Sequence, residues 1–302
     1  MRNFTFKGLF LAVVFIVLGS LSIQAADGLI TKQITIKLDE AGTLPNKIGS
    51  TKKFQITNLK IIGEINGRDL QMIREMAGKD VRGNDTDGML SVLDLSDAKI
   101  VEGGGYNING FYYPTSNDKI GDNAFCDCSG LTSLTLPSDV TEIGNAAFEG
   151  CSGLASLTLP SGVTKIGYSA FLRCSGLTSL TLPSGVAKIG DYAFHGCSGL
   201  TSIYVYAEKL PNMGNDVFEG CDAKKCTVYV LKGTYDDYWL SEFGYFENIV
   251  EFDPTGINNV ITSNDAKELS RYSLNGQRLS APSKGLNIVK YSDGSVKKVV
   301  VQ

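Results

Sequence analysis

IGDNAFCDCSGLTSLTLPSDVTE, which starts at Ile120, is the first of four closely similar units of 23 residues. The other three start at Ile143, Ile166 and Ile189, and all four share the pattern IGxxAFxxCSGL. A fixed period of about 20 to 30 residues that contains LxxLxL is typical of a solenoid, in which each unit contributes one short strand and one turn of a stack. The sequence therefore predicts a β-rich repeat solenoid, and such a scaffold favours a binding role over an enzymatic one.

Within each unit, the alternation of a strand predicts which residues are buried and which are exposed. A strand turns successive side chains to opposite faces, so in the first unit we expect Leu134 and Leu136 to be buried and Ser133 and Thr135 to be exposed. The phenylalanines of the AF dipeptide recur once per unit and are predicted to form an aromatic column in the core: Phe125, Phe148, Phe171 and Phe194. The glycine of the IG dipeptide marks a turn at which a side chain would obstruct the stack.

The solenoid is predicted to extend beyond the regular units in both directions. Residues 26–119 are interpreted as an N-terminal cap with irregular leucine-rich coils at 56–61 and 90–95, a helix between them and an inserted loop. Regular leucine-rich repeats follow over 120–232, ending in a degenerate copy. Residues 233–253 are rich in aromatic residues and predict a C-terminal cap that shields the open end of the core.

The N-terminus has the composition of an export signal. Arg2 and Lys7 precede the apolar stretch at 9–21, which has the length of a signal peptide core and is short for a membrane span, so residues 1–25 are predicted to be a signal peptide. Removing it changes the formal net charge from −4 to −6, because the lost charges are those of Arg2 and Lys7. A mildly acidic chain with dispersed lysines makes nucleic acid a poor partner. No segment after the signal peptide is long and apolar enough to cross a bilayer.

Seven cysteines in an exported protein raise the question of disulfides. Stacked neighbours could approach within bonding distance, but cysteine also packs as a small apolar residue, which each coil needs at this position. We therefore favour a buried column of free thiols, formed by Cys128, Cys151, Cys174 and Cys197 with Cys221 close to continuing it. Cys126 is expected to be the most exposed thiol.

The units IGxxAFxxCSGLTSLTLP resemble the BspA-like class of bacterial leucine-rich repeats. That resemblance implies a non-catalytic cell-surface protein that binds host matrix proteins or other cells. Residues 254–302 are a linker and a small β module, in which Asn275-Gly276 and Asp293-Gly294 predict hairpins. The ending RYSLNGQRLSAPSKGLNIVKYSDGSVKKVVVQ resembles the C-terminal sorting domains of type IX secretion, which implies contact with export or anchoring machinery; a β module that merely ends the protein is the alternative.

Three groups of residues are candidates for binding. The outward face of the regular strands carries only hydroxyl side chains, which suit weak, broad contacts: Ser133, Thr135, Ser156, Thr158, Ser179 and Thr181. At the C-terminal end of this face the residues become aromatic, and tyrosine contributes strongly to interfaces: Tyr204, Tyr206 and Tyr229. The inserted loop at 101–118 offers a third group, which either forms an adhesive patch or folds back over the irregular coils: Tyr106, Phe111, Tyr112 and Tyr113. Tyr235, Tyr238 and Trp239, beyond the last strand, are interpreted as cap packing.

Enzymatic chemistry finds little support in the sequence. His195 is the sole histidine and occupies a variable repeat position, so catalytic triads and histidine-rich zinc sites are not indicated, and no cofactor or metal is expected. Asp236, Asp237 and Glu242 could supply paired carboxylates, but solvated charges on a cap explain them equally well. We expect an exported protein of the cell surface or extracellular space, associated with the outer membrane or else periplasmic. Its predicted function is binding to extracellular protein, with glycan binding through the aromatic end as the alternative.

Overall fold

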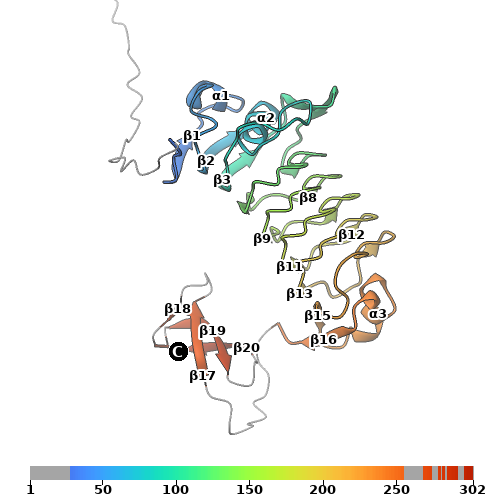
Figure 1. Ribbon diagram of the computed structural model, residues 1–302. Helices are drawn as coiled ribbons and strands as arrows, with labels where there is room; N and C mark the ends of the chain where they lie inside the picture. The colour runs from blue at the N-terminus through green and yellow to red at the C-terminus, as the bar shows by residue number, and fades with distance from the viewer. Residues whose placement is uncertain are drawn as a thin grey trace, which may run out of the picture.

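The computed structural model describes residues 28–254, 268–273, 278–279, 281–282, 284–291 and 296–301. The predicted signal peptide and most of the linker that follows residue 254 lie outside these residues. Residues 28–254 form a parallel-strand solenoid of leucine-rich-repeat type (Figure 1). A nine-stranded sheet runs along one side of the stack and a five-stranded sheet along the opposite side. Among the described residues, no helix combines the length and the apolar character needed to cross a bilayer.

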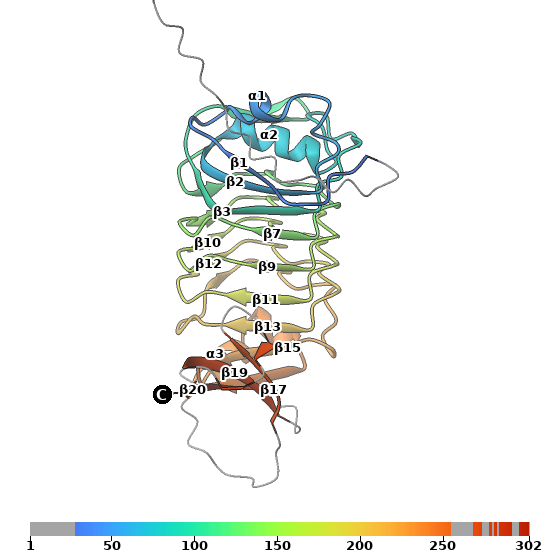
Figure 2. The same cartoon turned by 90° about the vertical axis from the view of Figure 1, so that its left-hand side faces the viewer.

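The nine-stranded sheet is parallel throughout, and Figure 2 shows it face on as a ladder of strands. Its register aligns equivalent repeat positions, so that Leu157 pairs with Leu134 on one side and with Leu180 on the other. Strands β7, β9 and β11 are short because Pro137, Pro160 and Pro183 follow their last buried leucine and proline cannot donate a ladder hydrogen bond. In order, the strands are β1 (Ile34–Lys37), β2 (Asn58–Ile65), β3 (Val92–Ile100), β7 (Ser133–Thr135), β9 (Ser156–Thr158), β11 (Ser179–Leu182), β13 (Ser202–Val205), β15 (Thr227–Leu231) and β16 (Asn248–Phe252).

The five-stranded sheet is built from two-residue strands that begin each repeat. Their first residues form one column and their second residues another, with the isoleucines buried. Gly167 lies directly after such a strand, and a Cβ on it would come within 2.6 Å of the backbone carbon of Gly144. Glycine is therefore required for the coils to stack at this spacing. The strands are β6 (Lys119–Ile120), β8 (Glu142–Ile143), β10 (Lys165–Ile166), β12 (Lys188–Ile189) and β14 (Asn212–Met213).

The core between the sheets contains the predicted columns. Phe148 stacks on Phe125 and Phe171 with ring centroids 5.4 and 5.1 Å apart, and the column continues through Phe194 to Phe218. The cysteine column beside it is buried and its thiols are free, as predicted. Cys126 is only partly buried, whereas the other six cysteines are buried, which confirms it as the most exposed thiol.

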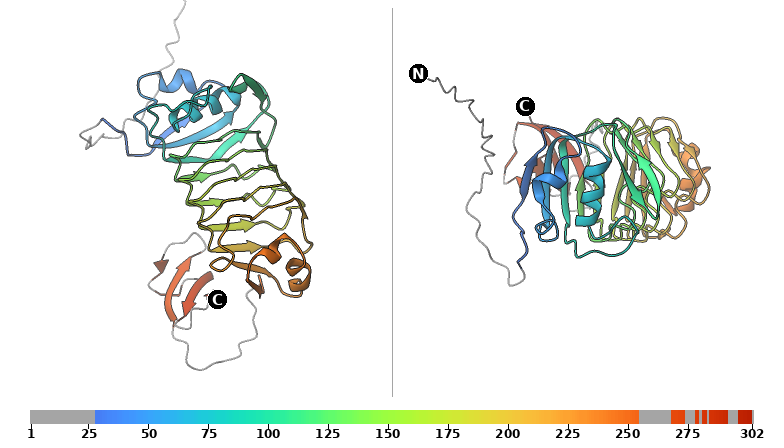
Figure 3. Two further views of the ribbon diagram at one scale, coloured as in Figure 1. Left: turned by 45° about the vertical axis from the view of Figure 1, so that its right-hand side comes forward. Right: turned by 90° about the horizontal axis from the view of Figure 1, so that it is seen from above.

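Helices lie at the two ends of the stack (Figure 3). At the N-terminal end are α1 (Leu44–Ile48) and α2 (Gly67–Met76). Asn66 caps α2 through a reciprocal pair of hydrogen bonds, in which its side chain accepts from Arg68 N–H and the Asp69 carboxylate accepts from Asn66 N–H. Buried Arg74 ties α2 to the first regular coil by donating to the carbonyl oxygens of Asn123 (2.9 Å) and Cys126 (3.0 Å). The two irregular coils form β2 and β3 as predicted, and β1 is an additional edge strand.

The C-terminal end is closed by residues 233–253. Their elements are α3 (Tyr235–Trp239), the 3₁₀ helix η1 (Glu242–Tyr245) and β16. Phe243 and Phe246 pack on Phe218, the last ring of the column, at centroid distances of 5.0 and 5.2 Å. Within this cap, β16 also pairs in parallel with β15 and extends the main sheet.

The tail forms a separate antiparallel sheet in the order β18-β17-β19-β20. Its strands are β17 (Glu268–Ser273), β18 (Arg278–Leu279), β19 (Gly285–Tyr291) and β20 (Val296–Val301). The predicted turn residues Asn275-Gly276 and Asp293-Gly294 lie outside the described residues, yet the strands on either side of each turn pair antiparallel. The strand pairing therefore agrees with two hairpins.

Candidate binding surface

The outward face of the nine-stranded sheet changes chemistry along the stack. Its N-terminal part is charged, since Lys60 forms ion pairs with Asp94 (3.0 Å) and Asp97 (2.8 Å). The regular coils then present hydroxyl groups, and the last coils present tyrosines. Because register aligns these positions, the change occurs within one column: Lys60, Asp94, Thr135, Thr158, Thr181, Tyr204, Tyr229 and Val250.

The predicted hydroxyl residues lie where alternation placed them. Thr135, Ser156 and Thr158 are exposed, and Ser133, Ser179 and Thr181 are partly exposed. Ser202 continues their column and donates its hydroxyl hydrogen to Ser179 Oγ at 3.1 Å. The surface is flat, polar and uncharged, so it offers hydrogen bonds without a strong attraction for any one ligand.

Aromatic residues gather at the C-terminal end of this face. Tyr204 and Tyr229 occupy paired register positions on β13 and β15 and stack with centroids 4.6 Å apart and an interplanar angle of 7°. Phe252, at the end of β16, meets Tyr206 and Tyr204 edge to face at 5.3 and 6.2 Å. All four side chains are half-buried. We call Tyr204, Tyr206, Tyr229 and Phe252 the tyrosine cluster.

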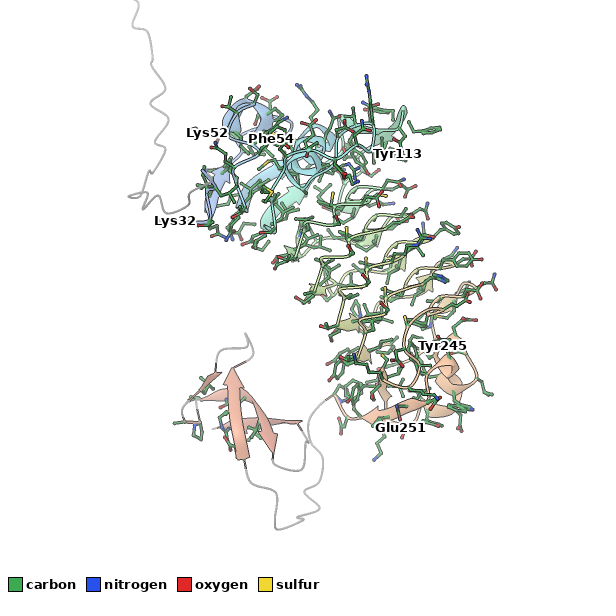
Figure 4. The ribbon with its side chains drawn as sticks, in the orientation of Figure 1. Lys32, Lys52, Phe54, Tyr113, Tyr245 and Glu251 are labelled. Atoms are coloured by element: carbon green, nitrogen blue, oxygen red, sulfur yellow. The ribbon has the colours of Figure 1, made fainter. Side chains whose placement is uncertain are left out.

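The cluster is rigid for its size because its rings pack against one another. Burial and the neighbouring Tyr229 and Tyr206 hydroxyls raise the pKa of Tyr204, so its hydroxyl stays protonated and able to donate. Sequence analysis missed Phe252, which it assigned only to the cap. The β-branched and aromatic residues of NIVEF were the available signal for a strand there. Figure 4 shows Glu251, from the same strand, at the C-terminal end of the solenoid.

The inserted loop forms a hairpin of β4 (Gly105–Ile108) and β5 (Phe111–Pro114). Placing Tyr106 in an adhesive patch was wrong: its ring is fully buried and its hydroxyl donates to the carbonyl oxygen of Asp122 at 2.7 Å. Tyr113 stacks on it at 5.7 Å and packs against the core. Phe111 and Tyr112 remain 67% and 60% exposed. The hairpin therefore packs Tyr106 and Tyr113 inward and leaves Phe111 and Tyr112 facing solvent.

The hairpin and the tyrosine cluster lie at opposite ends of the stack. In Figure 4, Tyr113 lies at the N-terminal end, whereas Tyr245 and Glu251 lie at the C-terminal end. One small ligand therefore cannot contact both groups, and the structure does not bring the predicted aromatic residues together into one site.

The cap residues divide by exposure. Tyr238 is buried and its hydroxyl donates to the carbonyl oxygen of Ala207 at 2.9 Å, as expected for cap packing. Tyr235 and Trp239 are instead 37% and 46% exposed and stack on each other, so packing does not explain them. Asp236 and Asp237 are exposed on α3, and Glu242 starts η1.

The described part of the chain holds no group of three or more histidine, cysteine or acidic side chains placed to bind a metal ion. His195 packs edge to face against Tyr192 at 5.8 Å, with Glu219 3.7 Å from its Nδ1 atom.

Comparison with known proteins agrees with this architecture. Residues 104–230 match the family model described as a BspA type leucine rich repeat region, in six copies. These residues are similar to the BspA type of repeat and make up less than half of the chain. No curated protein matches the sequence.

Two solved structures are similar to the chain. The pneumococcal vaccine antigen PcpA matches at 14% identity and a TM-score of 0.39, covering 65% of this chain and 57% of its own. A leucine-rich repeat protein from Bacteroides ovatus matches at 19% identity and a TM-score of 0.18, covering 45% of this chain and 59% of its own. The chain thus spans a little over half the length of each of these structures.

Proposed function

We propose that this protein is an exported, non-catalytic binding protein of the cell surface that attaches to an extracellular protein through the tyrosine cluster. The observation that carries the proposal is the cluster itself, four packed aromatic residues on a face that is otherwise polar. Tyrosine anchors contribute much of the energy in protein interfaces, because they offer a large contact area with few rotatable bonds and a hydroxyl for hydrogen bonding. The surrounding hydroxyl residues suit the polar rim of such an interface.

Binding of a glycan through the same cluster is the alternative function. A sugar ring packs on the face of an aromatic side chain, and Tyr204 and Tyr229 cover one face of each other at 4.6 Å. Phe252 covers a further part of the Tyr204 and Tyr206 rings through its edge-to-face contacts. The stacking favours contact through ring edges and hydroxyl groups, which fits a protein partner better than a sugar.

Export and surface attachment rest on the two termini. The basic and apolar leader at 1–25 is the ground for export, and the antiparallel tail sheet over 268–301 is a module of its own that fits a sorting or anchoring role. We place the mature protein at the cell surface, associated with the outer membrane, or in the extracellular space, with the periplasm as the alternative.

A binding screen with a matched variant tests the proposal. The purified protein is presented to a panel of immobilised matrix proteins and to a glycan array, and the affinity for the strongest hit is measured. The variant replaces Tyr204 and Tyr229 with threonine, the residue that earlier coils carry in the same column, so the fold is expected to be retained. We expect at least a tenfold loss of affinity for the protein hit. Thr135→Ala, three coils before Tyr204 in the same column, is the control and is expected to bind normally.

Each outcome of the screen decides between the functions. Hits confined to glycans and lost in the double variant would support the alternative, and undiminished protein binding by the double variant would refute the role of the cluster. Turnover of a polysaccharide that Asp236→Asn or Glu242→Gln abolishes would show that the protein is an enzyme.

A further inference from the structure

A hollow on the five-stranded sheet lies apart from the tyrosine cluster and has chemical features of its own. It measures about 400 Å³ and opens on the side of the stack opposite the nine-stranded sheet. Strands β10, β12 and β14 and the turns that follow them line it. Its polar lining residues are Asn145, Lys165, Tyr168, Lys188, Asp191 and Asn212.

The first feature is an excess of positive charge. The outward column of this sheet reads Lys119, Glu142, Lys165, Lys188 and Asn212 along the stack. Glu142 forms ion pairs with both Lys119, at 2.8 Å, and Lys165. Lys188 has no carboxylate within ion-pair distance among the residues that the structure describes, and it lies beside Lys165 in the register. Lys165 thus shares its one carboxylate with Lys119, and the neighbouring Lys188 has none.

The second feature is an interruption in a ladder of side-chain hydrogen bonds. In the turn after each two-residue strand, an Asp or Asn side chain accepts the backbone N–H of the equivalent residue in the next coil. Asn145 N–H donates to Asp122 Oδ1 at 2.7 Å, Tyr168 N–H to Asn145 Oδ1 at 2.9 Å, and Asn215 N–H to Asp191 Oδ1 at 2.9 Å. Tyr168 interrupts this series. The polar atom of its side chain is the hydroxyl oxygen at the far end of the ring, so it cannot accept the backbone N–H of Asp191.

The break leaves a donor open at the hollow. Within the described part of the chain, the backbone N–H of Asp191 has no acceptor, although the corresponding N–H groups of the coils before and after it are paired. Tyr168, which stands where the other coils have an Asp or Asn acceptor, is 52% exposed and lines the same hollow. Tyr192 meets this ring edge to face at 5.8 Å and holds its orientation.

These groups define the chemistry of a ligand. Lys165, Lys188 and the free N–H of Asp191 attract a carboxylate, because charge-assisted hydrogen bonds and backbone N–H groups both favour anionic oxygen. One oxygen of the Asp191 carboxylate accepts from Asn215, which leaves the other for a hydroxyl group. The Asn145 amide accepts from Tyr168 N–H and donates to Asp122 Oδ2, so it keeps one N–H for a ligand, whereas the Asn212 amide can both donate and accept. The exposed Tyr168 ring supplies an apolar face with a polar tip.

We propose that this hollow binds an acidic sugar residue, a uronic acid unit of an anionic glycan. Its carboxylate lies toward the two lysines, its hydroxyls reach Asp191 and the amides, and its C–H face packs on Tyr168. An acidic peptide would satisfy the lysines but would lack the ring hydroxyls that pair with Asp191 and the amides and the C–H face that packs on Tyr168. The volume lies at the small end of the range for ligand sites, which fits one or two sugar units.

Isothermal titration calorimetry of the full chain tests the proposal with two probes. Trigalacturonate carries the carboxylates and galactotriose is the uncharged match. We expect trigalacturonate to bind at least tenfold more tightly than galactotriose, with an affinity that decreases as salt is added. Lys188→Gln is expected to lower the affinity at least fivefold. Lys119→Gln is the matched control, since Lys119 lies in the same column outside the hollow, and it is expected to bind within twofold of the parent protein.

A second variant separates binding from folding. Tyr168→Asn restores the ladder, because the new amide can accept the Asp191 N–H as Asn145 accepts that of Tyr168. We expect this variant to have an equal or higher melting temperature and to lose trigalacturonate binding. Equal binding of both probes, unchanged binding by Lys188→Gln and Tyr168→Asn, or absence of binding at millimolar probe would overturn the proposal. Equal or tighter binding of a glutamate-rich peptide would assign the hollow to acidic peptides instead.

Discussion

The Cys151 thiol donates a hydrogen bond to the carbonyl oxygen of Phe125, 3.0 Å away and one coil earlier in the stack. The same bond joins Cys174 to Phe148 at 3.0 Å and Cys197 to Phe171 at 3.2 Å. The bond requires the proton of a thiol, so the column stabilises its cysteines in the reduced form. It gives each of these buried carbonyl oxygens a second donor, since Phe125 O also accepts the backbone N–H of Cys128 at 3.1 Å.

Thiol labelling checks this arrangement. Burial, together with the nearby Asp127 carboxylate, raises the pKa of Cys126 to about 12, so even the most accessible thiol is protonated near neutral pH. Because the thiolate is the nucleophile, we expect iodoacetamide at pH 8 to label the native protein slowly and at Cys126 first. Unfolding in urea should make all seven cysteines react. Peptide mass spectrometry reads the sites, and rapid native labelling of Cys151 would contradict the buried column.

Alkaline pH is expected to destabilise the solenoid through the same residues. Burial raises the pKa of Cys128 to about 11 and that of Cys174 to about 12, from a reference value of 9.0. Above pH 9 the unfolded thiols lose protons that the folded ones keep, so the free energy of unfolding falls with rising pH. Each thiol contributes a slope of about 1.4 kcal/mol per pH unit between its two pKa values. In urea unfolding at several pH values, Cys174→Ala should show a shallower slope than the parent protein; parallel slopes would refute the shift.

The leucine column predicts a large stability difference between adjacent residues. Leu157 is 6% exposed between Leu134 and Leu180, whereas Thr158 points outward. Leu157→Ala should lower the free energy of unfolding by about 2 to 5 kcal/mol through the cavity that it leaves. Thr158→Ala is the control and should change it by less than about 0.5 kcal/mol. Chemical denaturation measures both, and equal effects would show that the column is not packed as described.

The turn glycines offer a test of coil spacing. A Cβ on Gly167 would lie 2.6 Å from the Gly144 backbone, whereas the nearest atom to a Cβ on Gly162 is 3.4 Å away. Gly167→Ala forces the coils apart and is expected to cost about 1 to 3 kcal/mol or more. Gly162→Ala should stay close to neutral, since alanine also restricts the unfolded chain. A tolerated Gly167→Ala, seen as an unchanged melting temperature, would mean that the stack can relax without loss.

Removing residues 254–302 separates folding from delivery. Phe243 and Phe246 already cover the end of the aromatic column, so the shortened protein should keep the melting temperature of the solenoid within a few degrees. Surface display on the producing cells, measured by antibody labelling of intact cells, should fall sharply if the tail directs sorting. Normal display would leave the tail without the proposed role, and a large loss of stability would make it part of the fold.

The features that repeat could be predicted from the sequence. The 23-residue period fixed which side chains stack, so the phenylalanine and cysteine columns, the buried leucines and the outward hydroxyls were predictable from alternation alone. Helix α2 at the N-terminal end could also be predicted, because its apolar residues share one face and Gly78 follows its end. Tyr204 and Tyr229 could be placed outward because they replace threonines of known phase.

Features that depend on contacts between coils could not be predicted in this way. Whether Tyr106 was exposed depended on how an insertion without period packs, and its ring turns inward because the core offers the carbonyl of Asp122 and a stacking partner in Tyr113. Strand β16 joins the sheet because the outer edge of β15 is open for pairing. The ladder that Tyr168 interrupts joins residues 23 apart, and its geometry exists only when the two-residue strands are in register. Side-chain period is a local property of the chain, whereas a hollow between coils is a property of their spacing.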